Sequence, residues 1–369
     1  MKASVFGDTS EQTRGTQRPL AHSRGPAIRV VAFGGGTGLA NLLKGLKRYV
    51  RAPNRMGAFA RVIDNLCAVV AVTDDGGSSG RLRKELNMLP PGDIRNCIAA
   101  LSEDHGLLPR LFQHRFRSGT GLDGHSFGNL FLTALTSITG DFAEAVRQCS
   151  EILAISGHVY PATNSDVQVE AIMSDGNRVR GETHITASTG RIVEIQLVPA
   201  EARALPQTIE AIACADLITI GPGSLFTSLV PNLLVEGIPE ALATSRASRV
   251  LICNLMTQAN ESIGLTASDH VRVLHRHARV EFIDYVMLNT KPASPELKAR
   301  YAQQGCSQIN ADFEAREAFG LKVILGDYLE EVDGIARHDT ERVASDLLRL
   351  AKRGFRRQQR GCAPPGGSS

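Results

Sequence analysis

The chain has 369 residues, of which 43% are hydrophobic and 21% charged, a balance typical of a globular protein with a large core. Its 41 Lys and Arg and 38 Asp and Glu leave a formal net charge of +3, and the surplus gathers near the two ends. Because the middle is close to neutral, aromatic residues make up only 5% and Trp is absent, we expect no nucleic-acid partner.

Both ends of the chain are polar. Residues 1–27 are rich in Thr, Gln, Arg, Gly and Pro, and residues 354–369 end in Gly-Cys-Ala-Pro-Pro-Gly-Gly-Ser-Ser. Neither segment can bury enough apolar surface to order itself, so we predict disordered tails around one α/β nucleotide-binding domain at residues 28–353. No apolar run is long enough to span a membrane, and residues 1–27 lack the apolar stretch of a signal peptide. We therefore expect a cytoplasmic protein without membrane insertion.

The cysteines and histidines show no metal-binding pattern. The seven cysteines are scattered without C-x-x-C spacing, and we interpret them as reduced core thiols. His270, His275 and His277 come closest to a cluster, but no acidic or cysteine companion stands at ligand spacing, which favours a helix surface over a metal site.

Short apolar runs alternate with helical stretches along the chain. The runs are continuous rather than alternating, as expected for parallel strands covered on both faces, and they lie at 28–33, 66–73, 217–220, 250–253, 282–288 and 322–325. Helical patterns include 39–49, 94–101, 125–138, 141–153 and 224–234. This order predicts a Rossmann-like, doubly wound, mainly parallel sheet, with ligands bound beyond the carboxyl ends of its strands.

One stretch breaks this pattern. Residues 159–198 alternate polar and apolar around Ser174-Asp175-Gly176-Asn177, a hairpin signal, and a second turn is expected at Ser188-Thr189-Gly190. We predict a small antiparallel β insertion here.

The first strand runs into Gly34-Gly35-Gly36-Thr37-Gly38, which opens a helix. Unpaired N–H groups and the helix dipole favour an anion there, so Gly35, Gly36, Thr37 and Gly38 are candidate phosphate or diphosphate ligands. A merely tight turn is the alternative. Because Asn41 stands where G-x-G-x-x-G needs its last glycine, we expect neither nicotinamide nor flavin as a permanent cofactor.

The second strand ends in Asp74-Asp75-Gly76-Gly77-Ser78-Ser79-Gly80-Arg81. The Asp74 and Asp75 carboxylates could hold a divalent cation such as Mg²⁺, while Gly76, Gly77 and Ser78 bring N–H groups close to an anion and Arg81 matches phosphate oxygens. A solvated turn is the alternative.

The helix at 94–101 has its apolar positions at i, i+3, i+4 and i+7, and Asp93 is placed to cap its first turn. The rigid Pro90-Pro91-Gly92 approach aims this N-terminus, which makes Arg95 and Asn96 candidate ligand contacts. Arg83 and Lys84 are interpreted as solvated charges.

Gly124-His125-Ser126-Phe127-Gly128 matches the G-x-S-x-G motif of serine hydrolases. The residues before it are loop-like, whereas a nucleophile elbow follows a buried strand, so we do not favour hydrolysis. His125 and Asn129 lie one turn apart on the same helix face as candidate ligand contacts, and Ser126 alternatively caps the helix.

Two later strand ends carry small and polar residues. In Gly221-Pro222-Gly223-Ser224, Ser224 can cap the next helix, while Gly221 and Gly223 allow a phosphate or sugar to approach. Asn254, Thr257 and Gln258 suit a base or a sugar better than a phosphate. Plain turn chemistry and solvated loop residues are the alternatives.

Seven ordered motifs resemble the gluconeogenesis factor (YvcK-like) branch of the family that contains 2-phospho-L-lactate transferase (CofD), over about residues 28–330. They are F-G-G-G-T-G-L at 33–39, T-D-D-G-G-S-S-G-R-L-R-K-E-L at 73–86, P-P-G-D-I-R-N at 90–96, F-Q-H-R-F at 112–116, G-H-S-F-G-N-L at 124–130, I-G-P-G-S-L-F-T-S at 220–228 and C-N-L-M-T-Q at 253–258. The branch usually has Gly-Glu-Thr near Ala259-Asn260-Glu261-Ser262, a departure that leaves the ligand contacts around Glu261 open.

The resemblance implies a Rossmann-like sheet and a cytoplasmic protein that binds a nucleotide-sugar such as UDP-N-acetylglucosamine and serves cell shape and envelope synthesis on gluconeogenic carbon sources. The alternative is a CofD-like transferase that moves a phospholactyl group from a guanylylated donor to a deazaflavin. In that case Asp74 and Asp75 would hold Mg²⁺, Arg81 or Arg95 would neutralise charge and His125 would assist proton transfer. Fold-level analogy suggests a homodimer.

Overall fold

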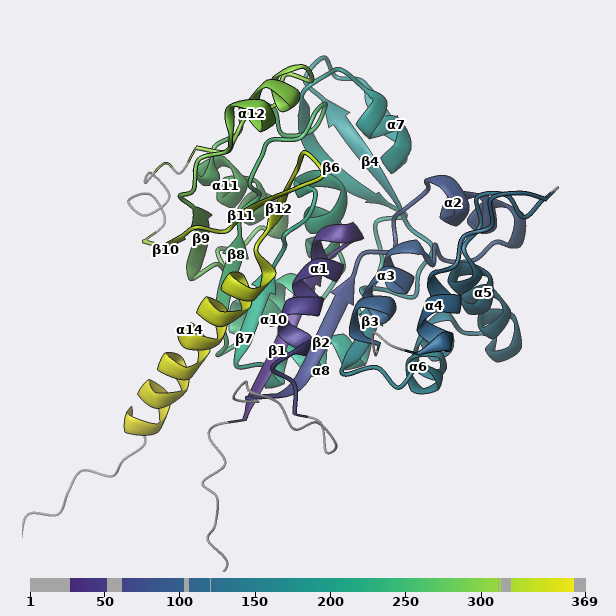
Figure 1. The fold of residues 1–369 in the computed structure, drawn as a ribbon, viewed down its shortest axis with the longest axis horizontal. Helices are drawn as coiled ribbons and strands as arrows, with labels where there is room; N and C mark the ends of the chain where they lie inside the picture. The colour runs from purple at the N-terminus through teal and green to yellow at the C-terminus, as the bar shows by residue number, and fades with distance from the viewer. Residues whose placement is uncertain are drawn as a thin grey trace, which may run out of the picture.

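The computed structural model describes residues 27–51, 62–102, 106–119, 121–310, 312 and 320–361. A seven-stranded parallel sheet in the order β10-β9-β8-β7-β1-β2-β3 forms its centre (Figure 1). This confirms the predicted α/β, Rossmann-like architecture. The strands are β1 (Ile28–Gly34), β2 (Ile63–Val70), β3 (His158–Pro161), β7 (Leu217–Ile220), β8 (Ser248–Ile252), β9 (Tyr285–Asn289) and β10 (Lys322–Gly326).

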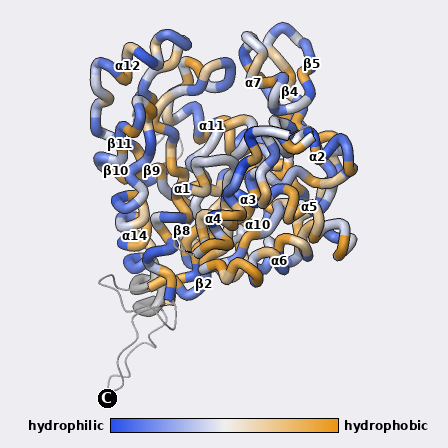
Figure 2. The backbone as a smooth tube through the Cα atoms, turned by 45° about the vertical axis from the view of Figure 1, so that its right-hand side comes forward, coloured by the Kyte–Doolittle hydropathy of each residue, from blue (hydrophilic) through white to orange (hydrophobic). Residues whose placement is uncertain are grey.

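Helices cover both faces of the sheet, with α1 and α14 in front of it and α8 and α10 behind it in Figure 1. The four residues of β7 are all buried, as expected for a strand between two helical layers. Figure 2 shows mostly hydrophobic residues around β2, α5 and α10. The helices are α1 (Gly36–Lys47), α2 (Gly77–Leu86), α3 (Gly92–Leu101), α4 (Leu107–Gln113), α5 (Phe127–Thr139), α6 (Phe142–Ile152), α7 (Glu182–Ala187), α8 (Pro206–Cys214), the π-helix η1 (Leu225–Leu229), α9 (Val230–Leu233), α10 (Ile238–Thr244), α11 (Ala267–Ala278), α12 (Pro295–Ala302) and α14 (Thr340–Gly361).

The antiparallel insertion is present, but it starts later than predicted. β4 (Gln168–Met173), β5 (Arg178–Arg180) and β6 (Ile192–Val198) pair in the order β5-β4-β6, and the predicted hairpin at 174–177 joins β4 to β5. The preceding β3 instead pairs in parallel with β2 as an edge of the main sheet. The second predicted turn follows α7 and leads into β6, which pairs with β4 rather than with β5. Alternating polarity shows that one face is buried, but it does not identify the partner strand.

A second hairpin, β11 (Leu329–Val332) and β12 (Ile335–His338), leads directly into α14. The predicted tail boundary at residue 354 falls inside α14, which ends at Gly361. Residues 1–26 and 362–369 of the predicted tails, including Cys362, lie outside the described residues. No helix in the described ranges is long and apolar enough to cross a membrane.

The cysteine prediction holds for five thiols, Cys67, Cys97, Cys149, Cys253 and Cys306, which are free and buried, whereas Cys214 is exposed.

The three clustered histidines lie on α11 but are buried, so the predicted helix-surface position is wrong. His277 accepts a hydrogen bond from the Ile195 N–H at 3.0 Å, and His275 Nε2 accepts from the Phe282 N–H at 3.4 Å. They serve packing between α11 and its neighbours. In the part of the chain that the structure describes, no three His, Cys, Asp or Glu residues group as metal ligands.

Candidate functional site

A cleft of about 380 Å³ opens at the carboxyl ends of β1 and β7. β1 lies between β2 and β7 in the sheet, and the chain continues from β1 toward β2 but from β7 toward β8. In doubly wound sheets ligands bind at such a point of reversal. The lining includes Gly35, Gly36, Thr37, Gly38, Asn41, Asp74, Asp93, Glu182, Pro222, Gly223, Ser224, Ser228, Asn254, Thr257, Gln258, Tyr301, Arg337, His338 and Thr340.

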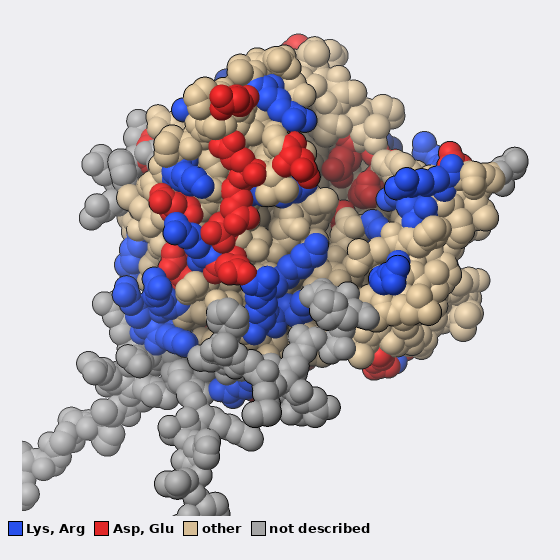
Figure 3. Space-filling model, in the orientation of Figure 1, with Lys and Arg blue, Asp and Glu red and all other residues tan. Residues whose placement is uncertain are grey.

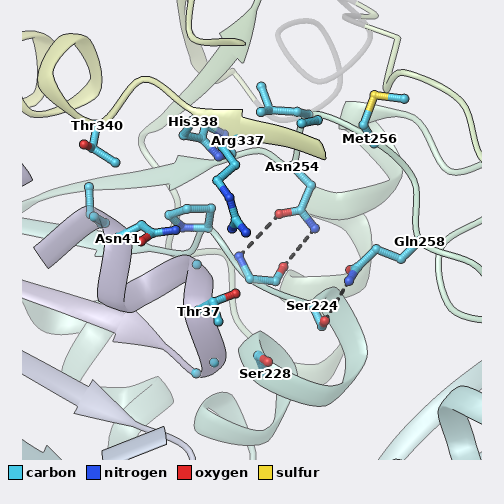
Figure 4. A pocket seen from close by; sticks show the side chains of 18 of the residues that line it. Thr37, Asn41, Ser224, Ser228, Asn254, Met256, Gln258, Arg337, His338 and Thr340 are labelled. Carbon is cyan, nitrogen blue, oxygen red and sulfur yellow. Dashed lines mark hydrogen bonds between the residues drawn. The ribbon is translucent and has the colours of Figure 1, made fainter. Parts of the chain in front are cut away.

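The first turn of α1 forms one wall of the cleft (Figure 4). Its N-cap Gly35 is extended and has no side chain to cap the helix, and the Gly36 N–H is bonded to Asp93, which leaves the following N–H groups of the first turn to an anion. Gly36 has φ 62°, a conformation that favours glycine. Gly38 approaches the next glycine turn so closely that a Cβ there would lie 2.4 Å from the Pro222 carbonyl oxygen. Two of the predicted glycine turns therefore share one cleft.

The 221–224 turn is held by side chains that were expected to contact ligand. The Asn254 Nδ2 donates to the Gly223 carbonyl at 2.8 Å, and its Oδ1 accepts from the Gly223 N–H at 3.3 Å. Gln258 Nε2 donates to the Ser224 Oγ at 2.8 Å (Figure 4). The Ser224 hydroxyl therefore does not cap the following helix as predicted. The polar groups after β8 shape the turn after β7.

Of the three polar residues after β8, Gln258 alone keeps an unused acceptor. Its buried Oε1 has no hydrogen-bond partner among the described residues. The Thr257 Oγ1 accepts from the Ser307 N–H at 2.9 Å and is almost fully buried. A ligand N–H or hydroxyl group is therefore best matched by Gln258.

Glu261 lies behind this wall and does not line the cleft. Its carboxylate accepts hydrogen bonds from the N–H groups of Phe226 at 3.0 Å and Thr227 at 2.9 Å, at the start of η1. Burial raises the pKa of this carboxyl, although the two N–H donors oppose the shift. Residues 259–262, where the sequence departs from the usual Gly-Glu-Thr, therefore lie on a loop whose Glu261 carboxylate stabilises the start of η1.

Three carboxyl groups, those of Asp74, Asp93 and Glu182, line another side of the cleft. Asp93 does not cap α3, whose N-cap is Pro91; it accepts a hydrogen bond from the Gly36 backbone instead. Burial and the nearby Asp74 raise the pKa of Asp93 to about 6. Burial, followed by repulsion from Asp93 and Asp74, raises the pKa of Glu182 to about 9, so Glu182 is protonated at neutral pH.

The predicted Asp74–Asp75 pair is divided. The Asp74 Oδ1 accepts from the Gly76 N–H at 2.9 Å within the turn. The Asp75 Oδ1 accepts from the backbone N–H and the hydroxyl of Thr183, at 2.9 and 2.6 Å, and so holds the start of α7. Asp75 does not line the cleft. Because the two carboxylates are engaged by different segments and only Asp74 faces the cleft, this pair does not fit a shared Mg²⁺, and we derive no step through a metal.

The fourth wall comes from the C-terminal part of the chain, which sequence motifs had not marked. β12 contributes Arg337 and His338, and α12 contributes Tyr301. The Arg337 side chain extends into the cleft toward the 221–224 turn (Figure 4), and no ion pair within the described ranges engages its guanidinium. His338 Nε2 lies 3.2 Å from the Cys253 carbonyl oxygen, and burial lowers its pKa to about 4, so the ring is neutral. Among the described residues that line the cleft, Arg337 is therefore the one that carries a positive charge.

The remaining predicted residues do not line the cleft, and several gather at the first turns of α2 and α5. The Ser78 Oγ lies 2.8 Å from His125 Nδ1 and accepts from Asn129 Nδ2 at 3.0 Å. The Ser126 Oγ caps α5 by accepting from the Asn129 N–H at 3.2 Å, and Ser126 is fully buried, which is unlike a nucleophile elbow. The residues outside the lining are Asp75, Gly76, Gly77, Ser78, Arg81, Arg95, Asn96, His125, Asn129 and Gly221.

The prediction that Arg83 is a solvated charge is also wrong. Its side chain is buried and donates to the Asp166 carboxylate at 2.5 Å and to the Val167 carbonyl at 2.7 Å. It ties α2 to the segment before β4 rather than facing solvent.

A family model described as 2-phospho-L-lactate transferase CofD matches residues 30–329. The chain belongs to the CofD family. Within the CofD family it is similar to the gluconeogenesis factor of Bacillus subtilis, with 45% identity over 89% of this chain and 99% of that protein. A putative gluconeogenesis factor of Nostoc sp. is 48% identical over 89% of this chain and 70% of its own length.

A solved structure supports the same assignment. The crystal structure of protein BH3568 from Bacillus halodurans has 44% sequence identity and a TM-score of 0.82, covering 87% of this chain and 99% of that one. The predicted resemblance to the gluconeogenesis factor branch of the CofD family is confirmed.

Proposed function

We propose that this protein is a gluconeogenesis factor that binds a nucleotide-sugar, such as UDP-N-acetylglucosamine, in the cleft between β1 and β7. The observation that carries the proposal is the N-terminus of α1 on one wall, where the N-cap Gly35 offers no side chain to the N–H groups beyond Gly36, and the Arg337 guanidinium on another. Backbone N–H groups at a helix N-terminus and a guanidinium fork are the donors that suit a diphosphate.

The other walls suit the uncharged parts of such a ligand. The unpartnered Gln258 Oε1 can accept from a base N–H or a sugar hydroxyl. The protonated Glu182 can donate a hydrogen bond instead of repelling the diphosphate, whereas the Asp93 carboxyl is largely ionised at neutral pH. Asp93 already accepts from the Gly36 N–H, so a phosphate must compete with it or use the neighbouring N–H groups of α1.

In this proposal the protein acts by binding and breaks no bond in the ligand. The resemblance to gluconeogenesis factors supports a cytoplasmic role in cell shape and envelope synthesis during growth on gluconeogenic carbon sources. A homodimer would be compatible with this role.

The test is isothermal titration of the full chain with UDP-N-acetylglucosamine, with and without Mg²⁺. We expect Arg337→Gln to weaken binding about tenfold, as for loss of one charge-assisted contact to a diphosphate. Arg300→Gln is the matched control, because Arg300 contacts the Asp333 carbonyl of the β11–β12 turn and does not line the cleft. Equal affinity of wild type and Arg337→Gln, or no binding by wild type, would refute the proposal.

The CofD family match also supports the predicted alternative, a transferase that moves a phospholactyl group. Asp74 is the member of the acidic pair that faces the cleft. Incubation with a guanylylated phospholactate donor, a deazaflavin and Mg²⁺ tests this alternative. Release of nucleoside monophosphate that is lost in Asp74→Asn would favour the transferase over the binding protein.

A further inference from the structure

Three arginines gather beside the cleft, and we call Arg81, Arg95 and Arg115 the arginine cluster. Arg81 lies on α2 and Arg95 on α3, and Arg115 precedes α5. The start of α5 and the turn before it join them: the Gly124 carbonyl accepts from Arg115, and a Cβ at Gly128 would lie 2.9 Å from Arg95 Cδ. None of the three lines the cleft.

Two of these side chains are held in place by one turn. The Arg81 Nη2 donates to the Asp123 carbonyl at 2.6 Å, and the Arg115 Nη1 donates to the Gly124 carbonyl at 2.5 Å. Gly124 has φ 79°, and a Cβ there would lie 3.2 Å from Arg81 Nη2. Neutral carbonyl groups therefore position both guanidinium groups, and among the described residues their remaining N–H donors have no acceptor.

The positive charge of the arginine cluster is not neutralised by direct pairing. Within the described residues no ion pair joins its members to a carboxylate; Arg95 donates to the Asn96 Oδ1 at 2.7 Å. Burial, and then the charge of Arg115, lowers the pKa of Arg95. Burial, and then the charge of Arg81, lowers the pKa of His125, which disfavours a positive charge on this ring. Three like charges held together in this way favour an anion between them.

Polar groups around the arginine cluster also lack partners. The Arg95 Nε–H is a buried donor without a partner in the described part of the chain, and the buried Asn129 Oδ1 is an unpartnered acceptor that suits only a protonated phosphate oxygen. Asn129 is only 2% exposed, and its amide is directed at Ser78 on the first turn of α2. No side chain caps α2, whose N-cap is Gly76. Free donors from a helix N-terminus therefore face the same region as the guanidinium groups.

We propose that the arginine cluster, together with the first turn of α2, binds a phosphate group of a small molecule at a second anion site outside the cleft. Figure 3 shows basic side chains on the rim near α2, next to the hollow in which acidic side chains are recessed. Asp93 and Asp74, which line the cleft, also act on Arg95, so the two sites adjoin. The second site does not depend on the identity of the ligand in the cleft.

The test is isothermal titration calorimetry of the full chain, with inorganic phosphate as the titrant. We expect saturable binding that weakens at least tenfold in Arg81→Gln/Arg115→Gln, while the affinity for UDP-N-acetylglucosamine changes less than twofold. Arg110→Gln is the matched control, since it removes the same charge from an exposed position on neighbouring α4. If the double variant does not fold, the single Arg115→Gln variant replaces it, because Arg115 is exposed.

Phosphate affinity equal to wild type in the arginine variants would overturn the proposal, as would absence of saturable phosphate binding in wild type. Equal loss of phosphate and UDP-N-acetylglucosamine binding would also overturn it, because one site would then account for both ligands. Failure of UDP-N-acetylglucosamine to bind wild type would refute the proposed function and leave the phosphate titrations to decide the second site.

Discussion

Replacing Glu182 by Gln should change how the stability of the protein depends on pH. In the folded state burial and the neighbouring Asp93 and Asp74 raise the pKa of Glu182 from 4.5 to about 9. Between these two values the folded chain holds a proton that the unfolded chain has released. Wild type therefore loses stability as the pH rises through this window, whereas a glutamine, which does not titrate, loses none.

The magnitude follows from the shift. One pKa unit corresponds to about 1.4 kcal/mol, so the difference in unfolding free energy between Glu182→Gln and wild type should grow by up to about 2.7 kcal/mol from pH 6 to pH 8. Water in the cleft screens the charge, which reduces the expected growth to about 1 to 2 kcal/mol. Asp93, whose pKa lies at about 6, titrates in both proteins and cancels in the comparison.

The assay is urea unfolding followed by circular dichroism at pH 6, 7 and 8. Glu210→Gln, at an exposed position on α8, is the control and should differ from wild type by a pH-independent amount. A difference between Glu182→Gln and wild type that is the same at pH 6 and pH 8 would show that the Glu182 carboxyl is ionised in the folded protein, contrary to our account of the cleft.

Three further predictions concern the walls of the site and are measured by urea unfolding. Gly38→Ala should destabilise the protein by about 1 to 3 kcal/mol, because the added Cβ would overlap the Pro222 carbonyl and this outweighs the gain of about 1 kcal/mol for alanine in a helix. Unchanged stability would contradict the close approach of Gly38 to Pro222. Glu261→Ala should lower the unfolding free energy by about 2 to 4 kcal/mol, because two buried N–H groups lose their acceptor, and Glu261→Gln should lower it clearly less. Equal losses in the two variants would argue that Glu261 does not act as the acceptor for η1. Arg83→Met should lower the unfolding free energy by about 1 to 3 kcal/mol, whereas Lys84→Met, at an exposed position, should leave it almost unchanged. Similar losses in the two variants would contradict the buried position of Arg83.

Local patterns predicted much of the framework. The run at 217–220 coincides with β7, and the run at 28–33 falls one residue short of β1. Gly35–Gly38 and Gly223–Ser224 were predicted at strand ends and line the cleft together. These predictions succeed because a buried parallel strand requires a continuous apolar run and its carboxyl end requires a turn, both of which are written in neighbouring residues.

Predictions that depended on distant partners failed. β3 carries the same alternation as the insertion, yet it pairs with β2. Asp75 was expected beside Asp74 in a metal site, but Thr183, more than a hundred residues later, takes its carboxylate. The histidines of α11 lack apolar character, and only the packing of α11 shows that they are buried.

Taken alone, the order of residues determined the class of fold, the edge of the sheet where the cleft lies, and the glycine turn that opens α1, since each depends on contacts within a few positions. Only the folded chain decided that Arg337 reaches that edge and that Arg81, Arg95 and Arg115 stand apart from it. The physical reason is that side chains from separate helices and strands become neighbours only when these elements bury their apolar faces against one another. A local sequence pattern shows that a face is apolar, but it does not show which other face will pack against it.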